Sequence, residues 1–221
     1  MNIYVKAFVI TVFVFLFGLF VGLNIERFML YDLEKKSASV ESSIRDIELE
    51  MLYFQGLGGN ESCSFLKEVV RTTNNKLDVM ADQLNSYGGK DILFTRDQVA
   101  SVKSTYTSLL IKDLILQERI KTECNSGGVS VLYFYSTNGC DDCVLQGDVL
   151  MLLKEAFKDK LMIFPIDVDV DSNMVRILMS KYGVKSEPSI VISGRLYSGI
   201  VRKDTLENVI CSGLPGAAEC A

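Results

Sequence analysis

The stretch VSVLYFYSTNGCDDC (Val129–Cys143) decides the fold of this chain. Its first seven residues, Val129–Tyr135, are rich in β-branched and aromatic side chains, which is typical of a strand buried on both faces. Ser136–Gly139 has the composition of a turn. The next segment, Val144–Lys158, has the periodicity of a helix. Five of its apolar residues recur at helical spacing: Leu145, Val149, Leu152, Leu153 and Ala156.

This order of elements places Cys140 at the N-terminus of a helix and Cys143 one turn further along the same face. The thiolate is the reactive form of cysteine, and the partial positive charge at the start of a helix stabilises it. Two thiols one turn apart can also close into a disulfide and reopen. The pair is therefore a candidate for dithiol redox chemistry.

The composition excludes several classes of function. The chain has 221 residues, enough for one or two small domains plus appendages, and a formal net charge of −5. Without a basic stripe it is not expected to bind nucleic acid. It contains no histidine, which removes Ser-His and Cys-His catalysis and the commonest metal ligand. A structural zinc site needs four ligands, so we predict neither a metal at Cys140 and Cys143 nor a cofactor.

The N-terminus carries an apolar segment. Residues 7–23 (AFVITVFVFLFGLFVGL) contain no charge and are just long enough to cross the hydrocarbon core of a membrane. The alternative is a cleaved signal peptide, but no small-residue cleavage site follows Leu23. We therefore interpret residues 1–25 as a transmembrane signal anchor. The flanking positive charges slightly favour a cytoplasmic C-terminus. The cysteines favour the opposite side and receive more weight, which predicts a single-pass membrane protein with an extracytoplasmic C-terminal part.

Residues 26–57 form the next predicted segment. Apolar residues recur there in steps of three and four: Leu30, Leu33, Val40, Ile44, Ile47, Met51 and Phe54. This heptad-like pattern predicts a helical stalk, with two interpretations of equal weight. The apolar seam either joins two copies of the chain into a homodimer or packs on the same chain.

Residues 60–125 are predicted to form a helical hairpin. One helix covers Cys63–Tyr87, and a second starts after the capping-box pattern Thr95–Gln98 and reaches Cys124. An antiparallel arrangement returns Cys124 to the neighbourhood of Cys63. We expect a structural disulfide between them, worth on the order of 3–5 kcal/mol for so long a loop. The alternative is two buried, reduced thiols.

Residues 128–212 alternate between strands and helices after the first strand and helix. Leu161–Val168, Pro188–Ile192 and Arg195–Val201 are predicted strands, and Asn173–Tyr182 and Lys203–Cys211 are predicted helices. This order predicts an α/β fold with a mixed sheet, parallel in its first half, and flanking helices. In the tail, residues 213–221, Cys220 either forms a local disulfide with Cys211 or leaves two free thiols.

Residues 128–212 resemble the thioredoxin-like superfamily. The resemblance rests on the strand that leads into C-x-x-C, on KYGVKSEPSIVI (Lys181–Ile192) and on the glycine-turn hairpin before the last helix. It implies that Cys140 is the exposed nucleophile and that Cys143 is the buried resolving thiol. It also implies that Pro188 is cis and faces the dithiol, with Glu187 beside it at the substrate-binding position.

Several residues depart from the pattern of that family. The position six residues before the first cysteine, often a buried acid, is Phe134, and an aromatic approach to Cys140 is replaced by Asn138 and Gly139. Asp141 and Asp142 place two negative charges between the sulfurs, which disfavours a thiolate. Because a stabilised thiolate makes an oxidant of a dithiol, these tuning acids favour a reductase or an isomerase over a strong oxidase. They can equally serve to reject acidic substrate proteins.

Two functions of different classes follow from the sequence. The first is a membrane-tethered thiol–disulfide oxidoreductase acting on protein cysteines through Cys140 and Cys143, with the other cysteines as two structural disulfides. The second is a thioredoxin-like interaction module that retains a static disulfide on a membrane-anchored stalk.

Overall fold

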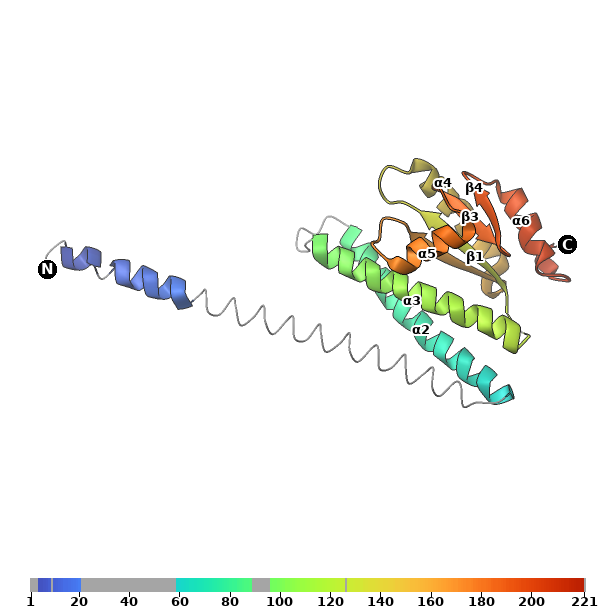
Figure 1. The fold of residues 1–221 in the computed structure, drawn as a ribbon, viewed down its shortest axis with the longest axis horizontal. Helices are drawn as coiled ribbons and strands as arrows, with labels where there is room; N and C mark the ends of the chain where they lie inside the picture. Colours follow the sequence, from blue (N-terminus) through green and yellow to red (C-terminus); the bar gives the residue numbers. More distant parts are fainter. Residues whose placement is uncertain (1–3, 9, 21–58, 89–95, 126, 221) are drawn as a thin grey trace. The chain divides into compact units, whose positions relative to one another are not determined.

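The computed structural model describes residues 4–8, 10–20, 59–88, 96–125 and 127–220 (Figure 1). The chain divides into two units, Met1–Leu57 and Gly58–Ala221. In the first unit, residues 4–8 and 10–20 are helical. Among the described residues, no helix combines the length and the apolar character that are needed to cross a membrane. Residues 1–3, 9 and 21–25 of the expected anchor and the whole expected stalk, 26–57, lie outside the described residues.

A four-stranded mixed sheet forms the centre of the second unit, as the sequence predicted. Its strands are β1 (Val129–Tyr135), β2 (Leu161–Asp167), β3 (Ser189–Ile192) and β4 (Arg195–Ser198), in the order β2-β1-β3-β4. β1 pairs parallel to β2 and antiparallel to β3, which pairs antiparallel to β4. β3 begins one residue after Pro188, because proline has no N–H to donate to the ladder.

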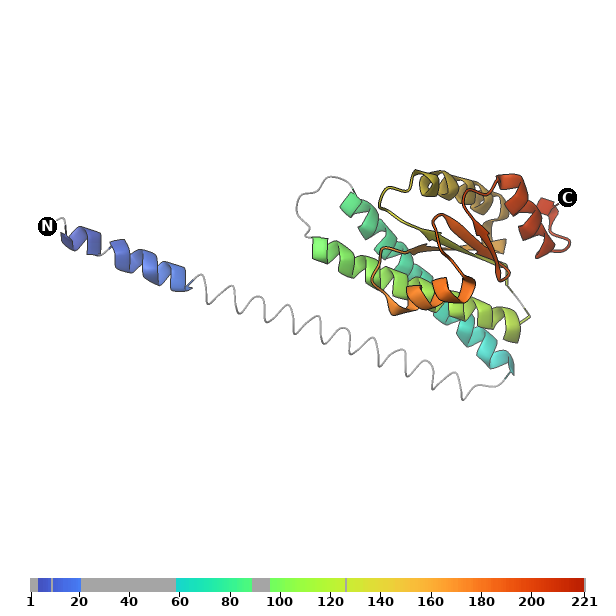
Figure 2. The same ribbon diagram turned by 45° about the horizontal axis from the view of Figure 1, so that its top comes forward.

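Helices cover both faces of this sheet (Figures 1 and 2). α4 (Asp141–Phe157) and α6 (Lys203–Ser212) lie on one face, and α5 (Asn173–Tyr182) lies on the other with the helical hairpin. The side chains of β1 alternate between two buried clusters: Val131 and Tyr133 pack under α4 and α6, and Leu132 and Phe134 pack under α5. β1 is therefore buried on both faces, as its composition predicted.

The buried face of α4 differs from the face that the apolar spacing indicated. Of the predicted residues, Leu153 is buried, whereas Leu145 and Leu152 are 56% and 54% exposed. The residues of α4 that are buried are Cys143, Gln146, Leu150, Leu153 and Phe157. Apolar residues occur almost all around this helix, so periodicity alone does not select one face. The buried face includes the polar Gln146, whose Oε1 accepts a hydrogen bond from the N–H of Val201 at 2.6 Å.

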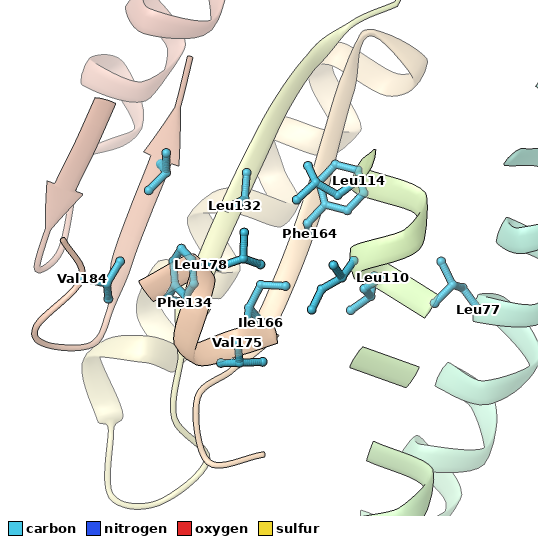
Figure 3. Close-up of a cluster of buried hydrophobic side chains, with 12 residues drawn as sticks. Leu77, Leu110, Leu114, Leu132, Phe134, Phe164, Ile166, Val175, Leu178 and Val184 are labelled. Carbon is cyan, nitrogen blue, oxygen red and sulfur yellow. The ribbon is translucent and has the colours of Figure 1, made fainter. Parts of the chain in front are cut away.

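The hairpin consists of α2 (Gly59–Gly88) and α3 (Arg96–Glu123). A disulfide joins Cys63 to Cys124, with an S–S distance of 2.14 Å. Leu110 and Leu114 of α3 belong to the same buried cluster as Phe164 of β2 and Leu77 of α2 (Figure 3). α3 therefore packs on α2 and on the sheet at once, so the hairpin and the α/β part share one core.

The C-terminal tail folds back onto the α/β part. Cys211 is bonded to Cys220, which belongs to the short helix η2 (Ala218–Cys220). Leu214 and Cys220 pack against the cluster under α4 and α6. Lys160, in the 3-10 turn η1 (Lys158–Lys160), forms an ion pair with Glu219 at 2.6 Å.

A buried carboxyl group in α3 predicts a pH-dependent stability. Asp113 is 5% exposed, and its Oδ1 has no hydrogen-bond partner. Burial raises its pKa to about 6, against the effect of a hydrogen bond with Gln117. Because the pKa in the folded state exceeds that in the unfolded state, the folded state binds the proton more tightly. The resulting stability is fully present below about pH 4 and is lost as the pH rises through about 6.

We therefore expect Asp113→Asn to raise the free energy of unfolding by about 2 kcal/mol at pH 7.5 and to change it little at pH 4. Denaturant unfolding of both forms across this pH range measures the difference. Asp82→Asn, which changes an exposed carboxylate of α2, is the matched control. Parallel pH profiles for the wild type and Asp113→Asn would show that Asp113 does not titrate in this range.

Candidate redox site

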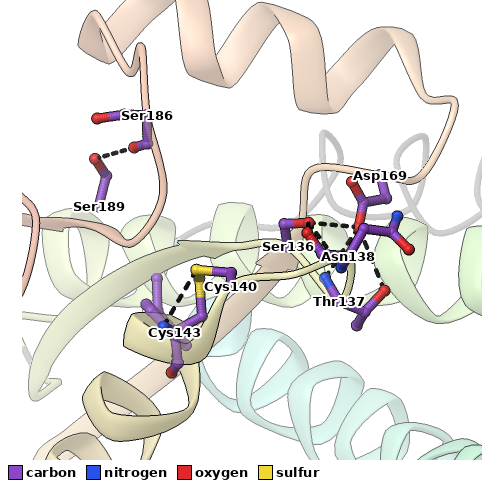
Figure 4. The surroundings of a disulfide bond; sticks show 9 residues. Ser136, Thr137, Asn138, Cys140, Cys143, Asp169, Ser186 and Ser189 are labelled. Atoms are coloured by element: carbon purple, nitrogen blue, oxygen red, sulfur yellow. Dashed lines mark hydrogen bonds between the residues drawn. A yellow bond between two sulfur atoms is a disulfide. The ribbon is translucent and has the colours of Figure 1, made fainter.

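Cys140 and Cys143 are bonded to each other at the start of α4. The S–S distance is 1.96 Å, and the backbone N–H of Cys143 lies 3.2 Å from Sγ of Cys140, which is the N-cap residue of the helix (Figure 4). Cys140 is half-buried, whereas Cys143 is only 4% exposed. A visiting group can therefore reach the first sulfur and not the second.

A cis peptide bond links Glu187 to Pro188 near this pair. Glu187 lines the same cavity as Cys140, and Pro188 is buried. The carbonyl oxygen of Pro188 accepts a hydrogen bond from the N–H of Gly199 at 2.8 Å, which ties the loop after β4 to this segment. The structure thus brings Glu187 to the cavity of Cys140, although the two residues are more than forty positions apart in sequence. Cys143 is bonded to Cys140, and Pro188 directly follows Glu187.

The cavity around Cys140 is open and acidic. It measures about 430 Å³, and it is lined by Ser136, Asn138, Gly139, Cys140, Asp141, Asp142 and Glu187. Asp141 and Asp142 are exposed in the first turn of α4, and Glu187 is half-buried. Three carboxyl groups therefore face the space that a partner of Cys140 would occupy.

Phe134, the sequence position that corresponds to the family's buried acid, lies away from the dithiol. Phe134 is fully buried on the opposite face of the sheet, in the cluster with Val175 and Leu178 (Figure 3). Tyr133 faces α4 instead, and its hydroxyl group donates a hydrogen bond to the carbonyl oxygen of Cys143. Side chains alternate along a strand, so an error of one position moves a residue to the other face of the sheet.

Tyr133 is the site residue that the sequence reasoning missed. Burial raises the pKa of its phenol to about 12, so the group is neutral at physiological pH and remains a donor. Its ring stacks on that of Tyr135, with 5.5 Å between the ring centroids. Burial, reinforced by the charge of Asp167, raises the pKa of Tyr135 as well. Period-two alternation counted back along β1 from Tyr135 could have placed Tyr133 on this face.

Two carboxylates at the end of β2 hold the turn that leads to Cys140. Oδ2 of Asp169 accepts hydrogen bonds from Oγ of Ser136 at 2.8 Å and from the N–H of Thr137 at 2.9 Å (Figure 4). Partial burial acts to raise the pKa of Asp169, but the hydrogen bonds from the turn outweigh it and lower that pKa. Asp167 is 4% exposed, and its Oδ1 accepts a hydrogen bond from the N–H of Asp169 at 3.0 Å.

These carboxylates do not form a metal site in the described structure. Among the described residues, no cluster of three or more His, Cys, Asp or Glu side chains is arranged to hold a metal ion. All six cysteines of the sequence lie in the described part, and all are paired as disulfides. Asp167 is the last residue of β2.

No protein-family model matches the chain, and no curated protein matches it. The fold of the α/β part is defined by the sheet order β2-β1-β3-β4, by helices on both faces of the sheet and by C-x-x-C at the start of α4. The α/β part fits a thioredoxin-like fold.

Solved structures with similar folds include thioredoxins. A structure described as that of a malarial protein is 24% identical, with a TM-score of 0.34, and the match covers 39% of this chain and 98% of that chain. Thioredoxin-2, described as a component of the malaria parasite protein secretion machinery, is 23% identical, with a TM-score of 0.34 and coverage of 39% and 84%. Chloroplastic thioredoxin z is 19% identical, with a TM-score of 0.37 and coverage of 45% and 89%.

Proposed function

We propose that this chain is a thiol–disulfide oxidoreductase, of the reductase or isomerase type, that acts on cysteines of other proteins. The observation that carries the proposal is the asymmetry of the pair: Cys140 is accessible at the N-terminus of α4, and Cys143 is bonded to it from a buried position. A reversible two-step exchange needs an accessible first sulfur and a protected second one.

In the reducing direction, the Cys140 thiolate attacks one sulfur of a substrate disulfide. A mixed disulfide forms between Cys140 and the substrate, and the other substrate sulfur leaves as a thiolate that takes up a proton. The Cys143 thiolate then attacks Sγ of Cys140, which releases the second substrate thiolate and forms the Cys140–Cys143 disulfide. The substrate gains two electrons, and an external thiol or dithiol must return two electrons to the pair. The hydrogen bond from Tyr133 to the carbonyl of Cys143 holds the resolving residue in place.

The charges at the mouth of the site bear on the reduction potential of the pair, and they are the reason for proposing the reductase or isomerase type. The start of α4 favours a thiolate at Cys140. Asp141 and Asp142 oppose this effect, since they place negative charge beside the same sulfur. A less stabilised thiolate means a less stabilised reduced form and therefore a more reducing pair.

We expect the double variant Asp141→Asn/Asp142→Asn to raise the reduction potential of the pair, with a shift on the order of 20 mV because both side chains are exposed to solvent. Equilibration with glutathione redox buffers measures the potential. Glu155→Gln/Asp159→Asn is the matched control, because it removes the same charge from exposed positions at or just beyond the C-terminal end of α4. An unchanged or lowered potential in the first variant would contradict the tuning role.

The proposal includes a membrane tether through residues 7–23 and an extracytoplasmic position of the α/β part. The uncharged apolar segment of the sequence supports the tether. The pairing of six cysteines in three disulfides supports an oxidising compartment, because such bonds are rare in cytosolic proteins. A homodimer through residues 26–57 is part of the same proposal, on the strength of the heptad-like pattern. Labelling of intact membranes with an impermeant thiol reagent after mild reduction tests the sidedness.

The second candidate function is a binding module whose Cys140–Cys143 disulfide is static. The replacement of an aromatic approach by Asn138 and Gly139 favours it, since this removes apolar surface for docking a substrate. Reduction of insulin by dithiothreitol in the presence of the intact chain separates the two functions. Accelerated precipitation of the insulin B chain supports the oxidoreductase. Precipitation at the uncatalysed rate supports the binding module.

A further inference from the structure

Lys103 connects the helical hairpin to the redox site. It lies on α3, and its Nζ donates hydrogen bonds to Oδ2 of Asp167 at 2.8 Å and to Oγ1 of Thr137 at 3.2 Å. Asp167 ends β2, and Thr137 belongs to the turn that precedes Cys140. One lysine from the hairpin thus contacts both the sheet and the redox turn.

The ion pair between Lys103 and Asp167 is well placed to affect the chemistry. The side chain of Asp167 is 6% exposed and that of Lys103 is 31% exposed. A buried carboxylate requires a partner, and removal of that partner leaves an uncompensated charge. Asp167 is also bonded to the N–H of Asp169, whose carboxylate accepts the hydrogen bonds from Ser136 and Thr137. A change at Lys103 therefore reaches the turn along two routes, directly through Thr137 and through the two aspartates.

The charge of Lys103 has a second effect. Asp141, Asp142 and Glu187 line the cavity around Cys140, and Asp167 and Asp169 lie behind the turn. Lys103 provides a positive charge in contact with Asp167 and with the turn residue Thr137. Loss of that charge disfavours a thiolate at Cys140.

We propose that Lys103 is a positioning residue of the redox site. Through it, the helical hairpin contributes to the reactivity of the Cys140–Cys143 pair in addition to its structural role. Through Thr137 and Asp167, Lys103 holds the turn that sets Cys140 at the N-terminus of α4. The inference rests on the dithiol chemistry proposed above, but it concerns the properties of the pair itself. It can therefore be tested without a protein substrate.

The test uses the intact chain with Lys103→Met, after mild reduction of the Cys140–Cys143 pair. The rate at which iodoacetamide alkylates Cys140 is followed against pH by mass spectrometry of the peptide, and the melting temperature is recorded in parallel. We expect the midpoint of the alkylation profile to rise by about one pH unit and the rate at neutral pH to fall about threefold. The fall is less than tenfold because a thiolate of higher basicity is a better nucleophile.

Two further variants keep the inference falsifiable. Thr137→Val removes the hydroxyl group that accepts a hydrogen bond from Lys103 and donates one to Asp169 at 3.3 Å, and it leaves the ion pair between Lys103 and Asp167 intact. It therefore remains informative if Lys103→Met fails to fold. We expect it to shift the midpoint in the same direction by about half as much. Lys121→Met removes an exposed lysine from the same helix and should leave the profile unchanged.

One pattern of alkylation profiles supports the inference, and two others overturn it. Upward shifts in Lys103→Met and Thr137→Val, with none in Lys121→Met, support the positioning role. A lower melting temperature with an unchanged alkylation profile would mean that Lys103 only docks the hairpin. Equal shifts in Lys103→Met and Lys121→Met would reveal a general charge effect and would also overturn the inference. Failure of the insulin assay with upward shifts in these variants would overturn the proposed enzyme and leave this inference standing.

Discussion

Removal of the Cys63–Cys124 disulfide, by Cys63→Ser together with Cys124→Ser, is expected to lower the free energy of unfolding by about 4 kcal/mol. The bond spans 61 residues, and the loss of chain entropy in the unfolded state grows with the logarithm of the loop length. It closes the open end of a hairpin whose second helix shares a buried cluster with the sheet. Loosening of this end therefore affects the stability of the whole second unit. Denaturant unfolding of the oxidised proteins measures the loss.

The second structural disulfide supplies an internal comparison. Cys211 and Cys220 are only nine residues apart in sequence, and the same relation gives about 2.5 kcal/mol for the double serine variant. We expect the pair at Cys63 and Cys124 to contribute more, and neither double variant to change the potential of the Cys140–Cys143 pair. A larger loss for Cys211→Ser/Cys220→Ser would contradict the loop-length argument. It would indicate that packing of the tail under α4 and α6 controls stability.

The sheet and its helices could be predicted from the sequence because several local signals agreed. The strand β1 is a run of β-branched and aromatic residues, and the turn Ser193-Gly194 has positive φ angles of 50° and 78° at both residues, as a tight hairpin requires. The pairing of Cys63 with Cys124 follows from antiparallel helices of similar length. These features depend on neighbours in sequence or on one simple long-range constraint.

The features that could not be predicted depend on which face of a strand or helix a residue lies on, and on contacts between distant segments. Counting six residues back from Cys140 gives Phe134 as the position of the family's buried acid, but the count takes no account of the conformation of the turn between them. Tyr133 occupies that place instead. The buried face of α4 was ambiguous because apolar residues occur almost all around the helix. Lys103 gave no signal at all, since a single lysine on a helix is usually a solvated side chain.

The largest expected effect belongs to Cys140. In Cys140→Ser the attacking sulfur is lost, and we expect insulin reduction to fall to the uncatalysed rate. Cys143 remains in this variant, but it is 4% exposed and is not accessible to a protein disulfide. Cys143→Ser should also turn over poorly, for a different reason. The first exchange still occurs at Cys140, but no resolving thiol is present to release the substrate.

Because the two variants fail at different steps, each serves as the control for the other. Cys143→Ser is expected to accumulate a mixed disulfide with a substrate protein, whereas Cys140→Ser is not. Both variants remove one sulfur and the same disulfide, so a general loss of stability affects them alike. The other four cysteines remain bonded in both variants.

The most direct test of the account is therefore the covalent complex formed when each reduced variant is mixed with a protein disulfide such as insulin, quenched with acid and mapped by mass spectrometry. We expect a complex for Cys143→Ser that is linked through Cys140, and none above background for Cys140→Ser. Equal trapping by the two variants, or linkage through one of the other four cysteines, would contradict it.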